Sequence, residues 1–294
     1  MTKTAWLFPG QGSQTVGMGV DLKELPAARA KFDRAEQILG WSVLELCQGE
    51  ESQLSRTLYT QPCLYAIESV LVDLMKERGQ HPQVVAGHSL GEYVALYAAG
   101  VFDFESGLKL VKRRAELMDS AEGGKMVAVL GFDREKMQAT LDKTDGVVLA
   151  NDNSDAQVVI SGIPEAVDTV LSQVKTKRAV ALNVSGAFHS PLMAEAAREF
   201  ENVLDAVAFN DASIPILSNA DPTPSRDGTQ LKQRLGRQMT GSVRWREIMA
   251  QLPELSVEKA VEVGPGQVLA GLLKRSHGAI ARMNVAGVED LEKL

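Results

Sequence analysis

The sequence predicts an α/β fold in which a mostly parallel sheet is interrupted once by a smaller inserted unit. Short apolar runs typical of buried strands alternate with amphipathic helices near both ends of the chain, which is the order of a parallel sheet covered by helices. From residue 125 the order changes to strand, helix, strand, strand, helix, strand, the βαββαβ pattern of a small ferredoxin-like subdomain. We therefore expect a core built from residues 1–124 and 190–294, with an inserted subdomain of residues 125–189.

The composition is that of a soluble protein with a sizeable core, because 45% of the 294 residues are hydrophobic and 23% are charged. No apolar run approaches the roughly 18 residues that a membrane helix needs, and the chain passes from Lys3 into an apolar run without a cleavage site. We expect a cytoplasmic protein that binds no membrane. A net charge of −7 argues against nucleic-acid binding as well.

The chain has two cysteines, Cys47 and Cys63. Two thiols cannot build a disulfide framework or a metal cluster, so we expect both to be reduced and partly buried. No group of His, Cys and acidic residues with the spacing of metal ligands is found elsewhere, and the sequence predicts no metal site.

The first part of the core begins with a strand and a glycine-containing loop from Pro9 to Gln14. The loop lacks the third glycine of a dinucleotide-binding turn, so we expect its amides to bind an oxyanion or to form a plain turn. Apolar residues at three- and four-residue spacing mark the helices that follow. Strands are predicted over 4–8 and 83–86, and helices over 18–39, 61–78, 92–99 and 104–118.

The inserted unit and the second part of the core follow the same rules. In the insert, strands are predicted over 126–130, 146–150, 157–161 and 178–182, and helices over 134–141 and 164–174. Beyond it, strands are predicted over 214–218 and 260–263, and helices over 192–207, 230–238, 245–251 and 267–275.

Gly87 to Gly91 places one serine, Ser89, between glycines directly after an apolar strand and directly before a helix. This G-x-S-x-G pattern is typical of a nucleophile elbow, a strained turn in which only glycine neighbours leave room. The sequence therefore predicts that Ser89 is a nucleophile.

A serine hydroxyl needs a base, and His189 is the best candidate among the four histidines. It lies among small residues at the junction between the insert and the next helix, where pockets tend to form. His81 and His277 are expected to be solvated. His88 adjoins Ser89, where neighbouring side chains point apart, so we expect it to support the turn or line the pocket.

The residues alone leave the partner of His189 open. A triad would need an acid between the serine and the histidine, and none of the available aspartates has a distinctive setting. An oxygen from the backbone or from an amide side chain can also orient an imidazole. A dyad and a triad are equally compatible with the sequence, and the aspartates considered are Asp103, Asp119, Asp145, Asp152 and Asp155.

Arg114 lies on the apolar face of its helix, in the same stripe as Val111 and Met118. An arginine on a buried stripe needs a partner, because an unpaired buried charge is costly. That partner is either a structural carboxylate or a carboxylate of the substrate, which a guanidinium can bind through two hydrogen bonds.

The chain resembles the family of malonyl-CoA:acyl carrier protein transacylases over nearly its full length. Six modest motifs in the same order carry this resemblance. They are Phe8 to Gln14, Gly87 to Tyr93, Val111 with Arg114 and Met118, Ser185 to Met193, Arg237 to Met239, and Glu262 to Gly266.

The resemblance implies that Ser89 carries the acyl group, that His189 is its base in a Ser-His dyad, and that Arg114 binds the free carboxylate of malonyl. It implies an oxyanion hole made by the backbone amides of Gln11 and Leu90. It also implies a hydrolase-like α/β core with a ferredoxin-like insert and the site in the cleft between them.

Two further residues gain a role from the same resemblance. The side chain of Gln238 is implied to lie beside the reaction centre. In related polyketide acyltransferases, a phenylalanine directly before the histidine accompanies malonyl selection, and this chain has Phe188 there.

The activity implied is transfer of malonyl from malonyl-CoA to the phosphopantetheine thiol of acyl carrier protein, through a malonyl-serine intermediate, in support of fatty acid synthesis. Malonyl-CoA is then a substrate, no cofactor is required, and we expect a monomer. The carrier is acidic, so we expect it to dock on local basic patches. The candidates are Lys112 with Arg113, Lys274 with Arg275, and Lys175 to Arg178.

Several alternatives remain open from the sequence. Water could attack the same acyl-enzyme, which would make the protein a thioesterase. The chain could also be a polyketide acyltransferase, a malonate decarboxylase component or a non-catalytic acyl-binding module.

Overall fold

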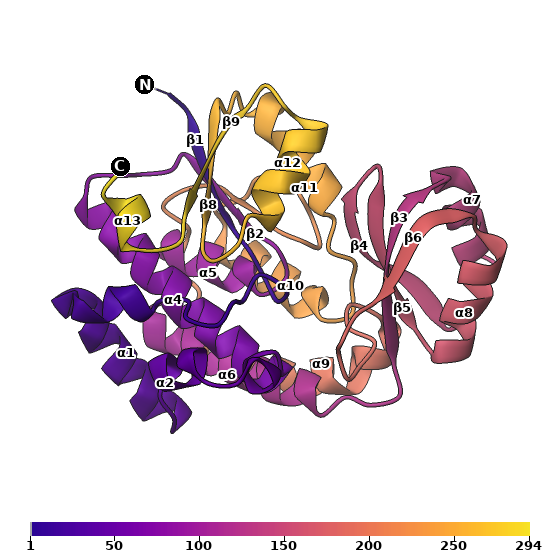
Figure 1. The fold of residues 1–294 in the computed structure, drawn as a ribbon, viewed down its shortest axis with the longest axis horizontal. Helices are drawn as coiled ribbons and strands as arrows, with labels where there is room; N and C mark the ends of the chain where they lie inside the picture. Colours follow the sequence, from indigo (N-terminus) through magenta and orange to yellow (C-terminus); the bar gives the residue numbers. More distant parts are fainter. Residues whose placement is uncertain (1) are drawn as a thin grey trace.

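The computed structural model describes residues 2–294, which form two sheets with helices packed around them (Figure 1). The larger sheet is parallel throughout, with the strand order β7-β2-β1-β8-β9. This confirms the predicted α/β class. The strand bounds are Thr4–Phe8 (β1), Val84–Gly87 (β2), Ile216–Leu217 (β7), Lys259–Val263 (β8) and Ala281–Val285 (β9).

Helices cover both faces of the larger sheet, and alternate residues of β1 face the two sides. Trp6 and Phe8 belong to one buried cluster, whereas Ala5 and Leu7 belong to another. The first cluster includes α1 (Pro26–Leu39), α4 (Thr57–Glu77), α5 (Gly91–Ala98) and α6 (Phe104–Asp119). The second includes α11 (Trp245–Glu254) and α12 (Val268–Ser276).

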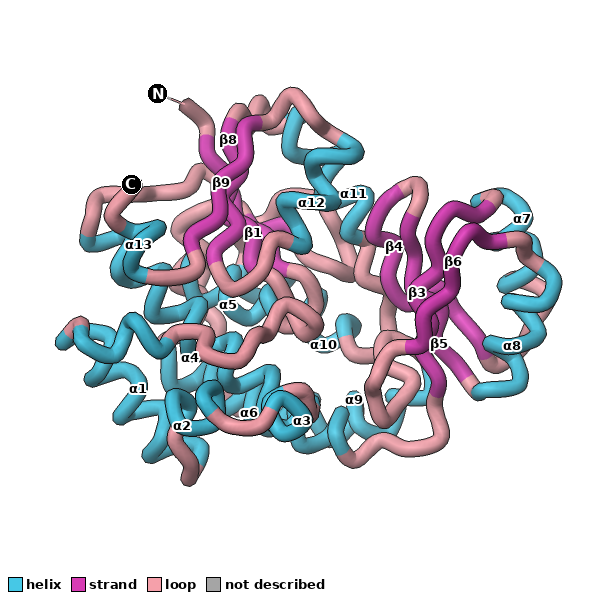
Figure 2. Tube along the Cα trace, viewed as in Figure 1, coloured by secondary structure: helices cyan, strands magenta, loops and turns pink. Residues whose placement is uncertain are grey.

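The smaller sheet is antiparallel, with the strand order β4-β5-β3-β6 of a ferredoxin-like unit. Its helices α7 and α8 lie on the side that faces away from the larger sheet (Figure 2). Val127 and Val129 pack toward these helices, whereas Met126 packs on the opposite side. The bounds are Lys125–Phe132 (β3), Arg134–Leu141 (α7), Val147–Ser154 (β4), Gln157–Gly162 (β5), Pro164–Gln173 (α8) and Thr176–Ala181 (β6).

All these elements fall within the predicted insert of residues 125–189, whose exact boundaries stay a prediction. A backbone connection joins the insert to the core. The amide of Asp152 donates to the carbonyl of Val243 at 2.9 Å, and the amide of Val243 donates to the carbonyl of Ala150 at 2.8 Å. β4 is therefore anchored to the segment that leads into α11.

The sequence patterns missed β9, which forms an edge of the larger sheet. Arg282 and Asn284 alternate with its apolar residues, so the strand has no continuous apolar run. β7 is shorter than the predicted strand over 214–218. The remaining helices are α2 (Val43–Gln48), α3 (Glu51–Leu54), α9 (Ala194–Asp205), α10 (Gly228–Gln238) and α13 (Val288–Leu291), with 3-10 turns at Val20–Glu24 and Pro191–Met193.

The helices and the acidic, histidine and cysteine side chains of residues 2–294 bear on membranes and metals. No helix in this range combines the length and the apolar character needed to cross a membrane. Within the same range, no three His, Cys, Asp or Glu side chains are grouped so that they could hold a metal ion.

Candidate active site

Ser89 lies in the turn between β2 and α5, with the strand before it and the helix after it that the sequence predicts. Its φ of 51° is in the left-handed region, which is costly for a residue with a side chain. The flanking glycines are required by packing. A Cβ on Gly87 would lie 1.9 Å from the carbonyl carbon of Gly91, and one on Gly91 would lie 2.1 Å from the carbonyl oxygen of Phe8.

His189 lies beside the serine, and its Nε2 is 2.7 Å from Ser89 Oγ. Its Nδ1 lies 2.9 Å from the backbone carbonyl oxygen of Gln238. A carbonyl can only accept, so Nδ1 carries the proton and Nε2 has a free lone pair toward the serine hydroxyl. Among residues 2–294, no carboxylate bonds to His189, so the pair is a dyad supported by a backbone oxygen.

Burial, assisted by the positive charge of Arg114, lowers the pKa of His189 to about 3. The folded protein therefore keeps this imidazole neutral below the ordinary pKa of 6.5. A neutral imidazole is the form that can accept a proton from serine.

Arg114 is 1% exposed and reaches the serine from α6. Its Nη2 donates to Ser89 Oγ at 2.9 Å, and its Nη1 donates to the side-chain oxygen of Gln61 at 2.6 Å. The guanidinium also lies 5.4 Å from the ring centre of Tyr93. No carboxylate of residues 2–294 is within 4.0 Å of it, so the first of the two predicted partners, a structural acid, is not in contact with Arg114.

The loop after β1 lies against the serine turn, which brings Gln11 near Leu90. A Cβ on Gly10 would lie 2.4 Å from the carbonyl oxygen of His88 and 3.6 Å from the amide nitrogen of Leu90, so only glycine allows this approach. Among residues 2–294, the amides of Gln11 and Leu90 have no hydrogen-bond acceptor. Both amides are therefore available to donate to a ligand, as the predicted oxyanion hole requires.

The comparison with known proteins is decisive for the family. Residues 5–290 match the family model described as the acyl transferase domain. The chain belongs to the acyl transferase family. This match confirms that the protein is an acyltransferase, the enzyme class that the six motifs imply.

Individual relatives of this acyltransferase share nearly its whole length. A malonyl CoA-acyl carrier protein transacylase of Synechocystis is 56% identical over 99% of the chain and 100% of the relative. A crystal structure of the Synechocystis transacylase has a TM-score of 0.98, with 55% identity over 99% of this chain and 100% of that one. A structure described as a type II PKS acyl-carrier protein in complex with its malonyl-transacylase has a TM-score of 0.94, with 36% identity over 99% and 98%.

The acyltransferase has a small cavity of about 80 Å³ above Ser89. Its lining includes Arg114, Phe188 and His88. An adjoining hollow of about 160 Å³ shares four residues with it and extends toward α12. The shared residues are Gln11, His88, Asn151 and Leu182.

His88 points away from the serine hydroxyl. Its Nε2 is 2.8 Å from the side-chain oxygen of Asn153, and its ring lies 5.4 Å from that of Trp245. Burial lowers its pKa, so it is held in the neutral form. It lines the cavity, as one of the two predicted roles requires, and it has no hydrogen bond to Ser89 Oγ.

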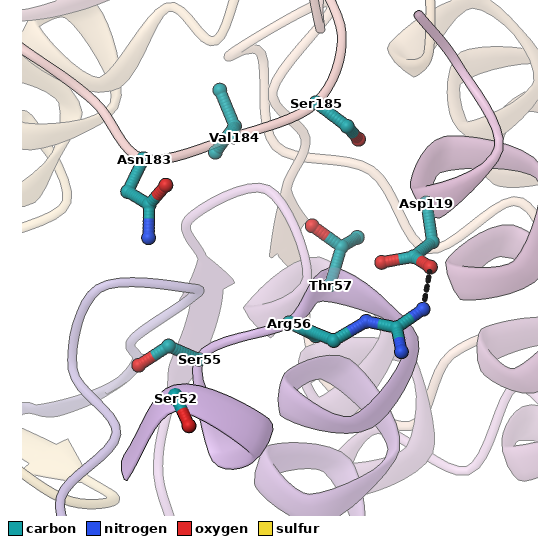
Figure 3. Close-up of a pocket in the computed structure, with 8 residues that line it drawn as sticks. All are labelled: Ser52, Ser55, Arg56, Thr57, Asp119, Asn183, Val184 and Ser185. Atoms are coloured by element: carbon teal, nitrogen blue, oxygen red, sulfur yellow. Dashed lines mark hydrogen bonds and ion pairs between the residues drawn. The ribbon is translucent and has the colours of Figure 1, made fainter.

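A polar cleft of about 330 Å³ lies on another side of the cavity and shares Val184 with it (Figure 3). Arg56 points along this cleft to Asp119 and donates to its carboxylate at 2.7 Å. The positive charge of Arg56 is therefore neutralised within the protein, in contrast to that of Arg114.

Gln238 lies beside Ser89 and Arg114, which is where the resemblance implies that it lies. Its side-chain oxygen accepts from Arg114 Nη2 at 3.1 Å, and its Nε2 donates to the carbonyl oxygen of Ser89 at 2.8 Å. Three other polar residues of the site were not expected from the sequence. They are Gln61, Glu92 and Asn219, all buried and bonded to the groups above.

Proposed function

We propose that this acyltransferase moves a malonyl group from malonyl-CoA to the phosphopantetheine thiol of an acyl carrier protein, through a malonyl ester on Ser89. The observation that carries the proposal is the Arg114 guanidinium, which is buried, contacts no carboxylate of residues 2–294, and lies 2.9 Å from Ser89 Oγ. A short acyl group with a free carboxylate supplies a direct ion-pair partner for this guanidinium. The names of the related transacylases support the same donor and acceptor.

Acylation follows from the placement of the groups. His189 Nε2 takes the proton of Ser89, and the serine oxygen attacks the thioester carbonyl of malonyl-CoA. The negative charge of the tetrahedral intermediate lies on the carbonyl oxygen, next to the amides of Gln11 and Leu90, and each such donor is worth about 3 kcal/mol. The carbon–sulfur bond then breaks, and the coenzyme A thiolate leaves as a thiol with the proton from His189.

The second half of the cycle repeats these steps with another thiol. His189 removes the proton of the carrier's phosphopantetheine thiol, the sulfur attacks the malonyl ester, and Ser89 leaves with the proton returned by His189. Donor and acceptor use one site in turn, which makes the cycle ping-pong. These steps need protein groups and the two substrates only, so the proposal includes no cofactor or metal.

The hollow next to the cavity is the proposed place for the thioester arm of both substrates. It adjoins Ser89 through Gln11 and His88, and it carries amide groups for the arm's own amides, such as those of Asn153 and Gln157. Leu182 and Val268 add exposed apolar surface at its edge. An arm with alternating amide and methylene groups matches this mixed lining.

Two of the three basic patches remain candidates for carrier docking. Arg113 pairs with Glu116 and Glu199, and Lys112 donates to the carbonyl of Ile38, so both are engaged within the protein. The residues of the other two patches, Lys274 with Arg275 and Lys175 with Lys177 and Arg178, are exposed.

A monomer in the cytoplasm belongs to the same proposal. Every group used in the steps above comes from one chain, so the site needs no second copy. Cys47 and Cys63 are buried and unpaired, which supports a reducing compartment.

Intact-mass spectrometry after incubation with malonyl-CoA tests the function. We expect a malonyl adduct on the wild-type protein, none on Ser89→Ala, and loss of the adduct with gain of malonyl on added carrier protein. Release of the label as free malonate would favour a thioesterase. The absence of any adduct on the wild type would favour a non-catalytic binding protein. Comparison of fatty-acid and polyketide carriers as acceptors separates the two pathway assignments.

A further inference from the structure

We propose that Asn219 and Glu92 are positioning residues that hold the serine turn in its left-handed conformation and fix it relative to the catalytic base. The proposal rests on Ser89 being the nucleophile, as proposed above, and extends the site to two residues that touch neither substrate. It is carried by a closed set of hydrogen bonds around the turn.

The topology explains how Asn219 reaches the turn. β7 pairs with β2 in parallel, and Val85 and Ala86 are opposite Ile216 and Leu217. The carboxyl ends of neighbouring parallel strands lie at the same edge of a sheet. The residue two positions after β7 therefore lies beside the residues that follow β2. Asn219 is that residue, and it is fully buried.

The side chain of Asn219 spans the first part of the strained turn, from Gly87 to Ser89. Its Nδ2 donates to the carbonyl oxygen of Gly87 at 2.6 Å, and its Oδ1 accepts from the amide of Ser89 at 2.7 Å. These two groups belong to the consecutive peptide units directly before the Cα of Ser89, whose φ is 51°. Only a side chain with both a donor and an acceptor can satisfy them together, and asparagine supplies one of each.

Glu92 connects these two hydrogen bonds of Asn219, which together form the Asn219 clamp, to the rest of the site. Its Oε2 accepts from the amide of Asn219 at 3.2 Å and from Gln238 Nε2 at 2.6 Å. The same Nε2 donates to the carbonyl of Ser89, and the backbone carbonyl of Gln238 holds His189 Nδ1. One buried carboxylate oxygen thus links the residue that holds the nucleophile to the residue that holds its base.

Ser89 reactivity toward a fluorophosphonate, followed by intact mass, tests the clamp without malonyl-CoA. The probe needs the serine and histidine but no carboxylate recognition, so its result is independent of the proposed acyl donor. For Asn219→Ala we expect a second-order labelling rate about 100-fold below the wild type, since a displacement of about 1 Å at a reacting atom costs about that much. Labelling within threefold of the wild type on folded protein would overturn the proposal.

Two conservative variants keep the test informative where alanine destabilises the fold. Asn219→Asp retains the shape and the acceptor for the Ser89 amide but has no donor for Gly87, so we expect slow labelling as with alanine. Glu92→Gln retains one oxygen acceptor, and we expect it to label within about fivefold of the wild type, whereas Glu92→Leu labels slowly. Equal labelling by Gln and Leu at this position would contradict the role of the Glu92 oxygen.

Asn284→Asp is the matched control, because Asn284 also donates to two backbone carbonyls, those of Glu262 and Gly264, at the β8–β9 edge. We expect it to lower the thermal midpoint without slowing labelling. In the clamp variants, kcat for malonyl transfer should fall with the labelling rate while KM for malonyl-CoA stays within about threefold. A purely structural role would lower the midpoint in all variants and leave the labelling rate of the folded fraction unchanged.

Discussion

Replacement of Arg114 by alanine tests the central assignment of the site, which is that this cation selects an acyl group with a free carboxylate. In the variant, a malonyl carboxylate would enter a buried cavity from which its partner has been removed. Removal of one partner of a buried ion pair costs about 3–5 kcal/mol, which corresponds to a fall of about 150- to 5,000-fold in kcat/KM for malonyl-CoA.

The loss with acetyl-CoA is expected to be smaller. Arg114 also donates to Ser89 Oγ and to Gln61, so the variant loses hydrogen bonds that both substrates use. Two such bonds are worth about 2 kcal/mol, or about 30-fold in rate, with either substrate. Because this loss is common to both substrates, it cancels in the ratio of malonyl to acetyl transfer, which should fall by about 150-fold or more.

The assay is acyl-enzyme formation from each thioester, measured as initial rate and as adduct mass. Arg113→Ala is the matched control on the same helix, since Arg113 forms an exposed ion pair with Glu199 at 2.6 Å, and it should change neither rate by more than about twofold. An equal loss with malonyl-CoA and acetyl-CoA would refute the reasoning, because Arg114 would then only orient Ser89.

Three further predictions concern the base, the oxyanion loop and the carrier. Because the folded state lowers the pKa of His189 to about 3, acylation should persist as the pH falls below 6.5. Arg114→Ala removes a nearby positive charge, so it should move the acid limb of the kcat/KM profile to higher pH. An acid limb that does not move would contradict this coupling between Arg114 and His189. Gly10→Ala should lower kcat by about 10- to 100-fold, measured in single turnovers. The added Cβ would lie 2.4 Å from the carbonyl oxygen of His88 in the serine turn and would push the loop away from it. Normal turnover would show that the Gln11 amide of this loop is not needed. Charge reversal at Lys274 and Arg275 should raise KM for the carrier and leave acylation by malonyl-CoA unchanged, and an equal loss in both half-reactions would argue against docking there.

Local sequence patterns were sufficient to predict those parts of the site that depend on residues close together in the chain. The serine turn could be predicted because Gly87 and Gly91 are needed for backbone packing inside one short segment. Arg114 could be singled out because its helix face is apolar, and the structure buries it there.

The residues that sequence reasoning missed depend on strand order. Asn219 reaches the turn only because β7 pairs with β2, although 130 positions separate Asn219 from Ser89. Gln61 lies in the first turns of α4 and is indistinguishable in sequence from a helical surface residue until α6 is packed against it. Glu92 follows the elbow directly and lies within the Gly87 to Tyr93 motif, but the motif does not indicate its hydrogen bonds to Asn219 and Gln238.

The support of His189 by the backbone of Gln238 has a consequence for how the enzyme tolerates sequence change. The partner of the imidazole is a main-chain oxygen, so no substitution at position 238 can delete it. Triads that use an aspartate lose their orienting group through a single codon change. Here the backbone at the end of α10 sets the tautomer of His189. The side chain at position 238 can therefore change its contacts with Arg114 and Ser89 while the carbonyl oxygen that accepts from His189 Nδ1 stays in place.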